Sequence, residues 1–251
     1  MLRDIFDEDA ELYDRVRPGY PEGLVADLVA RAGLGAGRRV LEIAPGTGQL
    51  TVPLARTGAE VTGVELGPAM AAVARRKLAG YSLARVEVGE FESWALPPEP
   101  YDLVVIATAY HWLDPAVRVR KPMEALRPGG VFAVVTTDHV RGGTPEFFDE
   151  VQAVYERWDP ATPPGLRTQD EQLVRTEVDF EPEEVRRYLR DITYTSAQYL
   201  DVLRSYSGHR ALSAERRDGL FAGIAELIDT RYGGRITKRY LHELIMVIRP
   251  G

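Results

Sequence analysis

A chain of 251 residues with 45% hydrophobic and 27% charged residues can bury a full core, as one large domain or one domain with an insertion. Its formal net charge of −7 and the lack of a basic cluster argue against nucleic acid as a partner. Without cysteine there are no disulfides or thiolate metal sites. Residues 1–9 lack the apolar core of a signal peptide and no apolar run reaches membrane-spanning length, so we expect a cytoplasmic protein that does not enter a membrane.

Strands and helices alternate through the first half of the sequence. The expected elements are a short helix within residues 2–16, helix Glu22–Ala32, strand Arg39–Ala44, helix Gln49–Arg56, strand 60–65, helix Pro68–Leu78, strand Arg85–Val88, strand Tyr101–Thr108, helix Pro115–Leu126 and strand Val131–Thr136. This order predicts a parallel, doubly wound sheet. Right-handed crossovers then place the carboxyl ends of all these strands, and with them the candidate sites, along one edge.

The composition changes after Asp138, where proline, arginine and glutamate become more frequent. Here the pattern predicts helix Pro145–Trp158, strand Val185–Tyr194, helices over 196–206 and 213–230, and strand Lys238–Ile248, while the prolines of 159–165 exclude a helix there. We therefore expect three segments: 1–138 as an N-terminal segment with the ligand-binding core, 139–183 as a cap insertion, and 184–251 completing the sheet and the substrate pocket.

The first expected strand leads into a loop of small residues and then a helix. Glu42, Ala44, Gly46 and Gly48 alternate through this loop, which predicts a ligand cradle at the carboxyl edge of the sheet. Small residues suit it because the backbone must turn sharply and approach a ligand closely.

Two cofactor classes use such a cradle. The dinucleotide fingerprint calls for glycine where this chain has Thr51, which disfavours NAD.

The spacing Glu42-x-Ala44-x-Gly46-x-Gly48 resembles motif I of the class I S-adenosylmethionine (SAM) methyltransferases, E/D-x-G-x-G-x-G, with alanine at the first glycine. The resemblance is strong over residues 10–136. It extends more weakly to the end of the chain, where 194–200 and 205–207 look like the tails of the type 11 and trans-aconitate-methyltransferase-like small-molecule groups. It implies a Rossmann-like, mostly parallel seven-stranded sheet with an antiparallel last strand and a helical cap. It also implies that Glu42 holds the loop and faces the methionine ammonium.

Acidic residues follow the next two expected strands. Glu65 stands 17 residues after Gly48, where the resembled family places an acid that accepts both ribose hydroxyls, and we expect Leu66 beside it to join the contact. The same position carries an acid in NAD-binding proteins. The resemblance further implies that Glu90 binds the adenine amino group and that the neighbouring Phe91 contributes a backbone amide to the ring.

The segment Thr108-Ala109-Tyr110-His111-Trp112 stands at the end of the expected strand Tyr101–Thr108. It is similar to A-F/Y-H-W segments of many small-molecule methyltransferases. There the strand end lies beside the transferred methyl group, so Thr108 is a candidate cofactor contact and His111 a candidate general base. An imidazole titrates near neutrality and can accept a hydroxyl proton. A histidine beside a tryptophan can equally be a packing residue. His139, just past strand five, is a second candidate.

The segment Tyr13-Asp14-Arg15-Val16-Arg17-Pro18-Gly19-Tyr20-Pro21 resembles a stretch that folds over the cofactor cleft in the same family. The resemblance implies that Tyr13 and Arg17 contribute to cofactor binding, and Arg17 can pair with a carboxylate of SAM or of the substrate. The alternative is a plain surface loop.

The sequence thus predicts a SAM-dependent methyltransferase, with SAM as its cofactor and no metal. The expected acceptor is a small molecule, most simply an oxygen nucleophile such as a hydroxyl or carboxyl, and an amine acceptor stays open. Two rival hypotheses are a SAM-binding sensor or scaffold without transferase activity and an NAD-dependent oxidoreductase. The expected assembly is a monomer or a homodimer.

Overall fold

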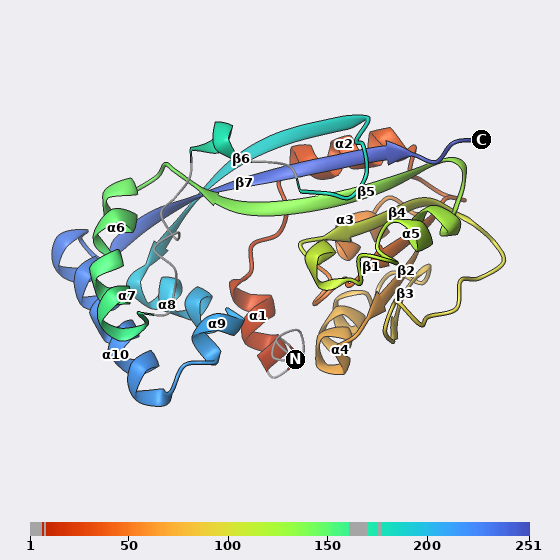
Figure 1. Cartoon of the computed structure of the whole chain (residues 1–251). Helices are drawn as coiled ribbons and strands as arrows, with labels where there is room; N and C mark the ends of the chain where they lie inside the picture. The colour runs from red at the N-terminus through yellow and green to blue at the C-terminus, as the bar shows by residue number, and fades with distance from the viewer. Residues whose placement is uncertain (1–6, 8, 161–169, 175–176) are drawn as a thin grey trace. The chain divides into compact units, whose positions relative to one another are not determined.

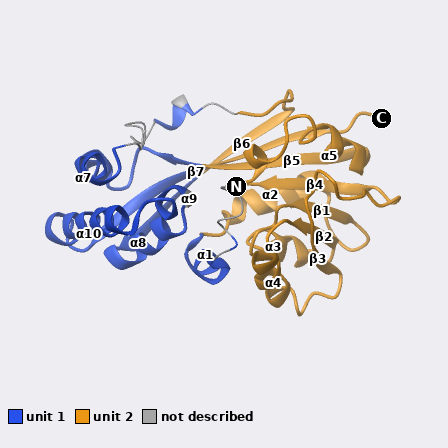
Figure 2. Cartoon of the chain, turned by 60° about the horizontal axis from the view of Figure 1, so that its bottom comes forward, with its two compact units in different colours: residues 1–17, 138–175, 189–241 blue, residues 18–137, 176–188, 242–251 orange. Residues whose placement is uncertain are grey.

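The computed structural model describes residue 7 and residues 9–160, 170–174 and 177–251. The chain forms two compact units, shown in different colours in Figure 2. Unit 1 comprises residues 1–17, 138–175 and 189–241, and unit 2 comprises residues 18–137, 176–188 and 242–251. Residues 1–17 therefore fall in a different unit from the rest of the expected N-terminal segment.

Unit 2 contains the alternating part of the chain. Its elements labelled in Figure 1 are α2 (Glu22–Ala32), β1 (Arg39–Ile43), α3 (Thr51–Ala55), β2 (Glu60–Glu65), α4 (Pro68–Lys77), β3 (Ala84–Val88), β4 (Tyr101–Ala107) and α5 (Arg120–Ala125). The 3-10 helix η2 (Tyr110–Trp112) follows β4. Three long strands contribute residues to both units: β5 (Leu126–Val140), β6 (Glu184–Thr195) and β7 (Arg235–Ile248).

The seven strands form one sheet in the order β3-β2-β1-β4-β5-β7-β6. The pairs β1–β2, β1–β4, β2–β3 and β4–β5 are parallel. Backbone hydrogen bonds join Gly129 to Arg249 and Thr144 to Thr237, so β7 runs antiparallel to β5. The expected doubly wound, mostly parallel sheet with an antiparallel last strand is therefore confirmed. The strand order reverses between β1 and β4, which is where open α/β sheets bind ligands.

Each face of the parallel strands carries its own core, because successive side chains point to opposite faces. Val40, Val61 and Leu103 pack on one face with Leu28 of α2 and Leu54 of α3. On the other face, Leu41, Val64, Val104 and Phe132 pack with Tyr110 of η2. Strands that are buried on both faces have continuous apolar sequences, and β4 has such a sequence.

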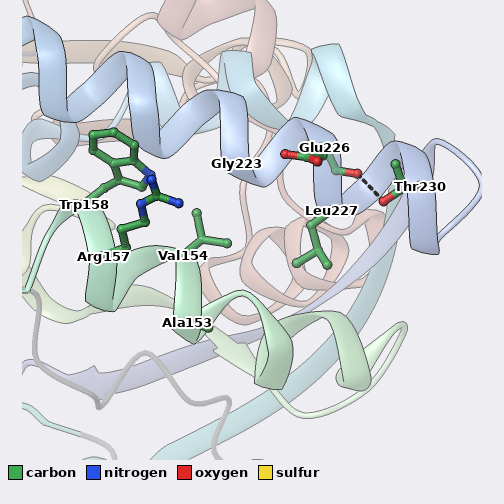
Figure 3. Close-up of a pocket in the computed structure, with 8 residues that line it drawn as sticks. All are labelled: Ala153, Val154, Arg157, Trp158, Gly223, Glu226, Leu227 and Thr230. Atoms are coloured by element: carbon green, nitrogen blue, oxygen red, sulfur yellow. Dashed lines mark hydrogen bonds between the residues drawn. The ribbon is translucent and has the colours of Figure 1, made fainter.

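Unit 1 is mostly helical and has a separate aromatic core that includes Phe147, Tyr199 and Phe221. Its helices are α1 (Ala10–Val16), α6 (Pro145–Glu150), α7 (Gln152–Trp158), the 3-10 helix η4 (Glu171–Leu173), α8 (Ser196–Arg204), α9 (Ser207–Arg210) and α10 (Ala214–Arg231). Gly219 and Gly223 on α10 let this helix approach α7 closely, as Figure 3 shows for Gly223. A Cβ at Gly219 would lie 2.5 Å from the Trp158 ring, and a Cβ at Gly223 would lie 2.7 Å from the Val154 side chain.

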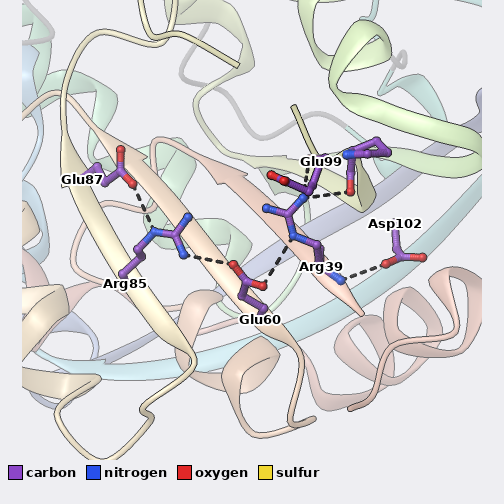
Figure 4. Close-up of polar contacts among 7 residues, drawn as sticks. Arg39, Glu60, Arg85, Glu87, Glu99 and Asp102 are labelled. Carbon is purple, nitrogen blue, oxygen red and sulfur yellow. Dashed lines mark hydrogen bonds and ion pairs between the residues drawn. The ribbon is translucent and has the colours of Figure 1, made fainter. Parts of the chain in front are cut away.

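Charged side chains run across four neighbouring strands of unit 2, from β3 to β4 (Figure 4). Arg85 pairs with Glu87 and Glu60, and Glu60 in turn pairs with Arg39. The backbone amide of Arg39 donates to Asp102 Oδ2 at 2.8 Å. Glu60 and Arg39 are the first residues of their strands, so this row cross-links the amino ends of β1 and β2 and leaves their carboxyl ends to the site.

Several expected elements have different bounds. The expected helix Pro115–Leu126 is regular only from Arg120, because Asp114 directs the backbone into turns by accepting from Ala116, Val117 and Arg118. The expected strand Val131–Thr136 starts at Leu126, since a register shift opposite Tyr101–Leu103 absorbs the proline and glycines before Val131. The expected helix Pro145–Trp158 is two helices that meet at Val151.

Parts of two expectations, the start of the helix within 2–16 and most of the non-helical stretch 159–165, lie outside the described residues. Among the residues that are described, no helix has the length and apolar character needed to cross a membrane.

Candidate functional site

The loop after β1 turns through backbone conformations that side chains rarely adopt. Ala44, Gly46 and Gly48 have φ angles of 55°, 59° and 86°. The Ala44 amide donates to the Val64 carbonyl at 2.9 Å, and the Gly48 amide donates to the Pro45 carbonyl at 2.9 Å. The alternation of small residues in the sequence thus reflects alternating left-handed positions, and Ala44 adopts one without being glycine.

The glycines of this loop serve different purposes. A Cβ on Gly48 would lie 3.4 Å from the Ala74 Cβ, so this glycine lets α4 pack against the loop. A Cβ on Gly46 would meet only the Met70 Cε within 4 Å, at 3.8 Å. The loop is also backed by Gly63 of β2, where a Cβ would lie 2.9 Å from the Pro45 ring. Gly46 therefore leaves space beside the backbone for a bound group, while Gly48 and Gly63 fix the position of the loop.

Glu65 ties this loop to the start of α4. Its Oε2 accepts from the Gly46 amide and its Oε1 from the Gly67 amide, each at 2.8 Å, and Gly67 caps the N-terminus of α4. The residue is 7% exposed. An ionised carboxylate has about four lone-pair positions. The two amides use two of them and hold both oxygens beside the loop.

Glu42 is an ionisable residue in the interior, at 1% exposure. Its Oε2 has no hydrogen-bond partner. Burial raises the pKa of Glu42 to about 7; the nearby Thr51 hydroxyl opposes this shift and the Glu65 carboxylate adds to it. A buried carboxylate with an unsatisfied oxygen is costly to maintain. It is a candidate partner for a cationic group of a ligand.

The segment after β3 lies beside Glu65. The Gly89 amide donates to the Glu65 carbonyl at 2.9 Å, which brings Glu90 and Phe91 to the same edge of the sheet. Phe91 is buried, and its carbonyl accepts from Lys121 Nζ at 2.7 Å. The same ammonium also donates to the carbonyls of Glu92 and Trp94. Sequence reasoning missed this role of Lys121, because nothing in the motif points to a lysine 30 residues away.

The end of β4 carries the second strained residue. Thr108 has φ 56°, and its hydroxyl donates to the Ala107 carbonyl at 2.8 Å and lies 3.3 Å from the Tyr20 hydroxyl. His111 follows in η2, is exposed, and stacks on Trp112 with a ring-centroid distance of 4.7 Å. Partial desolvation, and then the positive charge of Arg118, lower the pKa of His111 below its usual value. The imidazole is therefore neutral at pH 7 and able to accept a proton.

The remaining predicted residues are distributed over both units. Leu66 is 37% exposed, next to Glu65 in unit 2. Tyr13 and Arg17 belong to unit 1, where the Arg17 guanidinium lies 5.0 Å from the centroid of the Tyr13 ring. His139 is also in unit 1, against Phe148. Unit 2 alone therefore brings together the loop, Glu42, Glu65, Leu66, Glu90, Phe91 and Thr108 along one strand edge.

Unit 1 contains a surface pocket of about 340 Å³ between α7 and α10. Figure 3 shows its lining, which includes Arg157, Trp158 and Leu227. No residue predicted from the sequence lines it. Among the described residues, no three or more histidine, aspartate or glutamate side chains are grouped so that they could hold a metal ion.

Comparison with known proteins agrees with this geometry. Residues 40–130 match the family described as a methyltransferase domain. An uncharacterised methyltransferase of Mycobacterium tuberculosis is 36% identical over 123 residues, covering 49% of this chain and 48% of the relative. An uncharacterised methyltransferase of Geobacillus kaustophilus is 35% identical over 141 residues, covering 52% and 65%. The chain thus spans about half to two thirds of the length of these relatives.

Solved structures share the fold over nearly the whole chain. A structure described as a putative type II methyltransferase from Anaeromyxobacter dehalogenans has a TM-score of 0.61 at 23% identity, covering 93% of this chain and 98% of that one. A putative methyltransferase from Bacillus halodurans has a TM-score of 0.54 at 19% identity, covering 90% and 99%. The matched segment begins at β1 and contains the loop, Glu65, Glu90 and the end of β4. Over residues 40–130 the chain is therefore similar to a methyltransferase domain.

Proposed function

We propose that this protein transfers the methyl group of SAM to an oxygen atom of a small-molecule acceptor. The observation that carries the proposal is that two buried carboxylates, Glu42 and Glu65, flank the loop after β1. Glu65 accepts from the Gly46 amide and would accept from ribose hydroxyls, while Glu42 holds an unsatisfied oxygen suited to an ammonium group. A nucleoside that also bears an amino acid satisfies both, and SAM is such a molecule.

The neighbouring side chains suit the rest of this cofactor. Leu66 presents an exposed apolar surface next to Glu65, as a base ring would need. Glu90 would bind the adenine amino group, with the Phe91 backbone held in place by Lys121. Ala44, Gly46 and Gly48 would form the wall nearest the methionine part.

SAM supplies an activated methyl group on a sulfonium, which is a good leaving group, so the protein mainly has to align acceptor and donor and exclude water. Thr108 would position the acceptor at the end of β4. His111 would take the proton of an acceptor hydroxyl, because its lowered pKa keeps the imidazole neutral at physiological pH. A carboxylate acceptor would need no base. One relative, 37% identical over 110 residues, is named a protein-L-isoaspartate O-methyltransferase, so oxygen methylation occurs among the relatives of this domain.

Calorimetric titration of the full chain with S-adenosylhomocysteine tests the proposal. We expect saturable binding to the wild type and none to Gly46→Arg, because the side chain would occupy the space beside the loop. Gly80→Arg is the matched control, since a Cβ at Gly80 meets nothing within 4 Å. Glu65→Gln is a milder variant, for which we expect affinity to fall about 10- to 100-fold, as expected for a lost charged hydrogen bond.

Circular dichroism must show that each variant is folded. Failure of the folded wild type to bind S-adenosylhomocysteine would refute the proposal, and binding of NADH at the same site would favour an oxidoreductase. Cofactor binding without transfer to any member of a broad acceptor library would favour a sensor or scaffold.

A further inference from the structure

Two cations meet around one tyrosine in unit 1. The Arg17 guanidinium lies 4.5 Å from the centroid of the Tyr206 ring, and the Lys238 ammonium lies 3.2 Å from the Tyr206 hydroxyl. Lys238 is only 6% exposed. Its ammonium also lies 4.9 Å from the centroid of the Tyr240 ring. Both cations therefore lie among aromatic rings, and Lys238 is buried while Arg17 is half-buried.

Neither cation has a carboxylate partner within the described part of the chain. The protein contains 38 acidic and 31 basic residues, so carboxylates are in surplus. Arg239, the neighbour of Lys238 on β7, pairs with one of them, Asp191 of β6. Arg17 bonds only weakly, to the Ser205 carbonyl at 3.5 Å, and its Nε is buried without a partner. Lys238 is a buried charge without a carboxylate partner, and Arg17 is a half-buried one. Such charges are costly, and an anion from outside the chain would offset that cost.

A third nitrogen belongs to the same surroundings. His139 Nε2 is buried without a hydrogen-bond partner. Burial first, and the nearby positive charge of Lys238 second, lower the pKa of His139 to about 2, which favours the neutral ring. A neutral imidazole can donate one hydrogen bond without adding charge.

We propose that Arg17 and Lys238, with His139, form a binding site for the carboxylate of a small organic acid that has an apolar or aromatic body. Two cations and one neutral donor suit a singly charged carboxylate, and the tyrosine rings around them suit an apolar body. This site lies within unit 1 and is independent of the proposed function.

The alternative is that the anion is internal. Desolvation raises the pKa of Tyr206, but Lys238 and Arg17 outweigh it, and the net effect is a lowered pKa. A Tyr206 phenolate could therefore neutralise both cations without any ligand. Tyr206→Phe removes that possibility and leaves the cations in place, so it separates the two explanations.

Calorimetry of the full chain at low ionic strength, titrated separately with benzoate and with inorganic phosphate, tests the site. We expect benzoate to bind the wild type with a dissociation constant of roughly millimolar order, as for a small ligand held by one main contact. Lys238→Met and Arg17→Gln should each weaken binding at least tenfold. Arg235→Met, which removes an exposed charge from the same strand, should leave binding unchanged. Tyr206→Phe should bind benzoate at least as well as the wild type.

Thermal unfolding supplies an independent measurement. Lys238→Met should raise the melting temperature in the absence of ligand, because it removes a buried unpaired charge and keeps a side chain of similar length. An unchanged or lower melting temperature in a folded Lys238→Met protein would contradict a charge kept for a ligand.

The other outcomes are equally decisive. Equal binding to wild type and Lys238→Met, or no benzoate binding up to the highest soluble concentration, would overturn the site. Tighter binding of phosphate than of benzoate would overturn the carboxylate assignment. Binding that appears only in Tyr206→Phe would show that the phenolate is the natural partner. If S-adenosylhomocysteine binds and benzoate does not, only this inference fails, whereas the reverse result leaves the anion site standing and removes the proposed function.

Discussion

Ala44 and Thr108 are the only non-glycine residues with positive φ in the described chain, at 55° and 56°, and they follow two neighbouring strands. Ala44 follows β1 and Thr108 follows β4, which are paired in parallel with Ile43 opposite Ile106. Backbone strain therefore lies on both sides of the point where the strand order reverses. Strain kept at such a position is expected when it shapes a binding site rather than the fold.

Ala44→Gly should stabilise the protein. The left-handed conformation costs a non-glycine residue about 1–2 kcal/mol, and glycine adds about 0.5–1 kcal/mol of unfolded-state entropy, so a net gain of roughly 0.5–1 kcal/mol is expected. Urea denaturation at constant m-value measures it. Ala72→Gly, on the exposed face of helix α4, is the control and should destabilise by about 1 kcal/mol. A loss of stability in Ala44→Gly would mean that the alanine methyl makes contacts that outweigh the strain.

Glu42 should make the wild type less stable as the pH rises. Its folded-state pKa of about 7 lies above its ordinary value of 4.5, so its contribution is fully present below pH 4.5 and is lost as the pH rises through 7. At pH 8, Glu42→Gln should therefore be more stable than the wild type, by about 1–3 kcal/mol if the amide is accommodated. The difference should shrink at pH 5.

Urea titrations at pH 5 and pH 8 measure this, with the exposed Glu99→Gln as a control for the change in net charge. An equal stability difference between wild type and Glu42→Gln at both pH values would contradict the raised pKa. If the ammonium of SAM pairs with Glu42, cofactor binding near pH 6.5 should also release a proton. Calorimetry in buffers of different ionisation enthalpy detects that release, and Glu42→Gln should abolish it.

The parts of this fold that could be predicted are those encoded by local periodicity. The apolar runs of β1 and β4 and the small residues between Glu42 and Gly48 define the core and the loop without any knowledge of distant contacts. Local reasoning also placed acids at the strand ends, because parallel strands end at one edge. It did not separate helices α6 and α7 at Val151, where the apolar pattern continues through the break.

The parts that could not be predicted depend on residues far apart in the sequence. Nothing near Lys238 indicates that it lies against Tyr206, and nothing near Lys121 indicates that it holds the carbonyl of Phe91. The burial of Glu42 is hidden for the same reason, since an acid at the end of a strand usually reaches solvent. Long-range pairing in the folded chain decides each of these contacts.

His111 should titrate below its usual pKa near 6.5 in the folded protein. Partial desolvation and the positive charge of Arg118 both disfavour the imidazolium. Nuclear magnetic resonance titration of the ring proton should show this, and Arg118→Gln should raise the pKa, because it removes a positive charge and leaves Asp179 without its cationic partner. If His111 is the base, the rate of methyl transfer should fall only at pH values below this titration, and His111→Ala should lower turnover about 10²–10⁴-fold without changing S-adenosylhomocysteine affinity. Equal turnover in His111→Ala would assign the residue to packing against Trp112.

Asp102 should anchor the amino ends of the sheet in a pH-dependent manner. Desolvation opposes the shift, but hydrogen bonds from Arg127, from the Arg39 amide and from Arg38 together lower the pKa of this carboxylate. Its contribution to stability is therefore complete above the unfolded-state pKa near 3.9 and is lost as the pH falls through the lower folded-state value. Asp102→Asn should cost about 2–3 kcal/mol at pH 7, as expected for charge-assisted bonds to a mostly buried group, and much less at pH 3.

Asp149→Asn is the matched control, because its pairing with Arg141 at 3.9 Å is exposed and should be worth less than about 1 kcal/mol. Urea denaturation at the two pH values measures both variants, and an Asp102→Asn cost that persists undiminished at pH 3 would show that the carboxylate acts there through its shape rather than its charge.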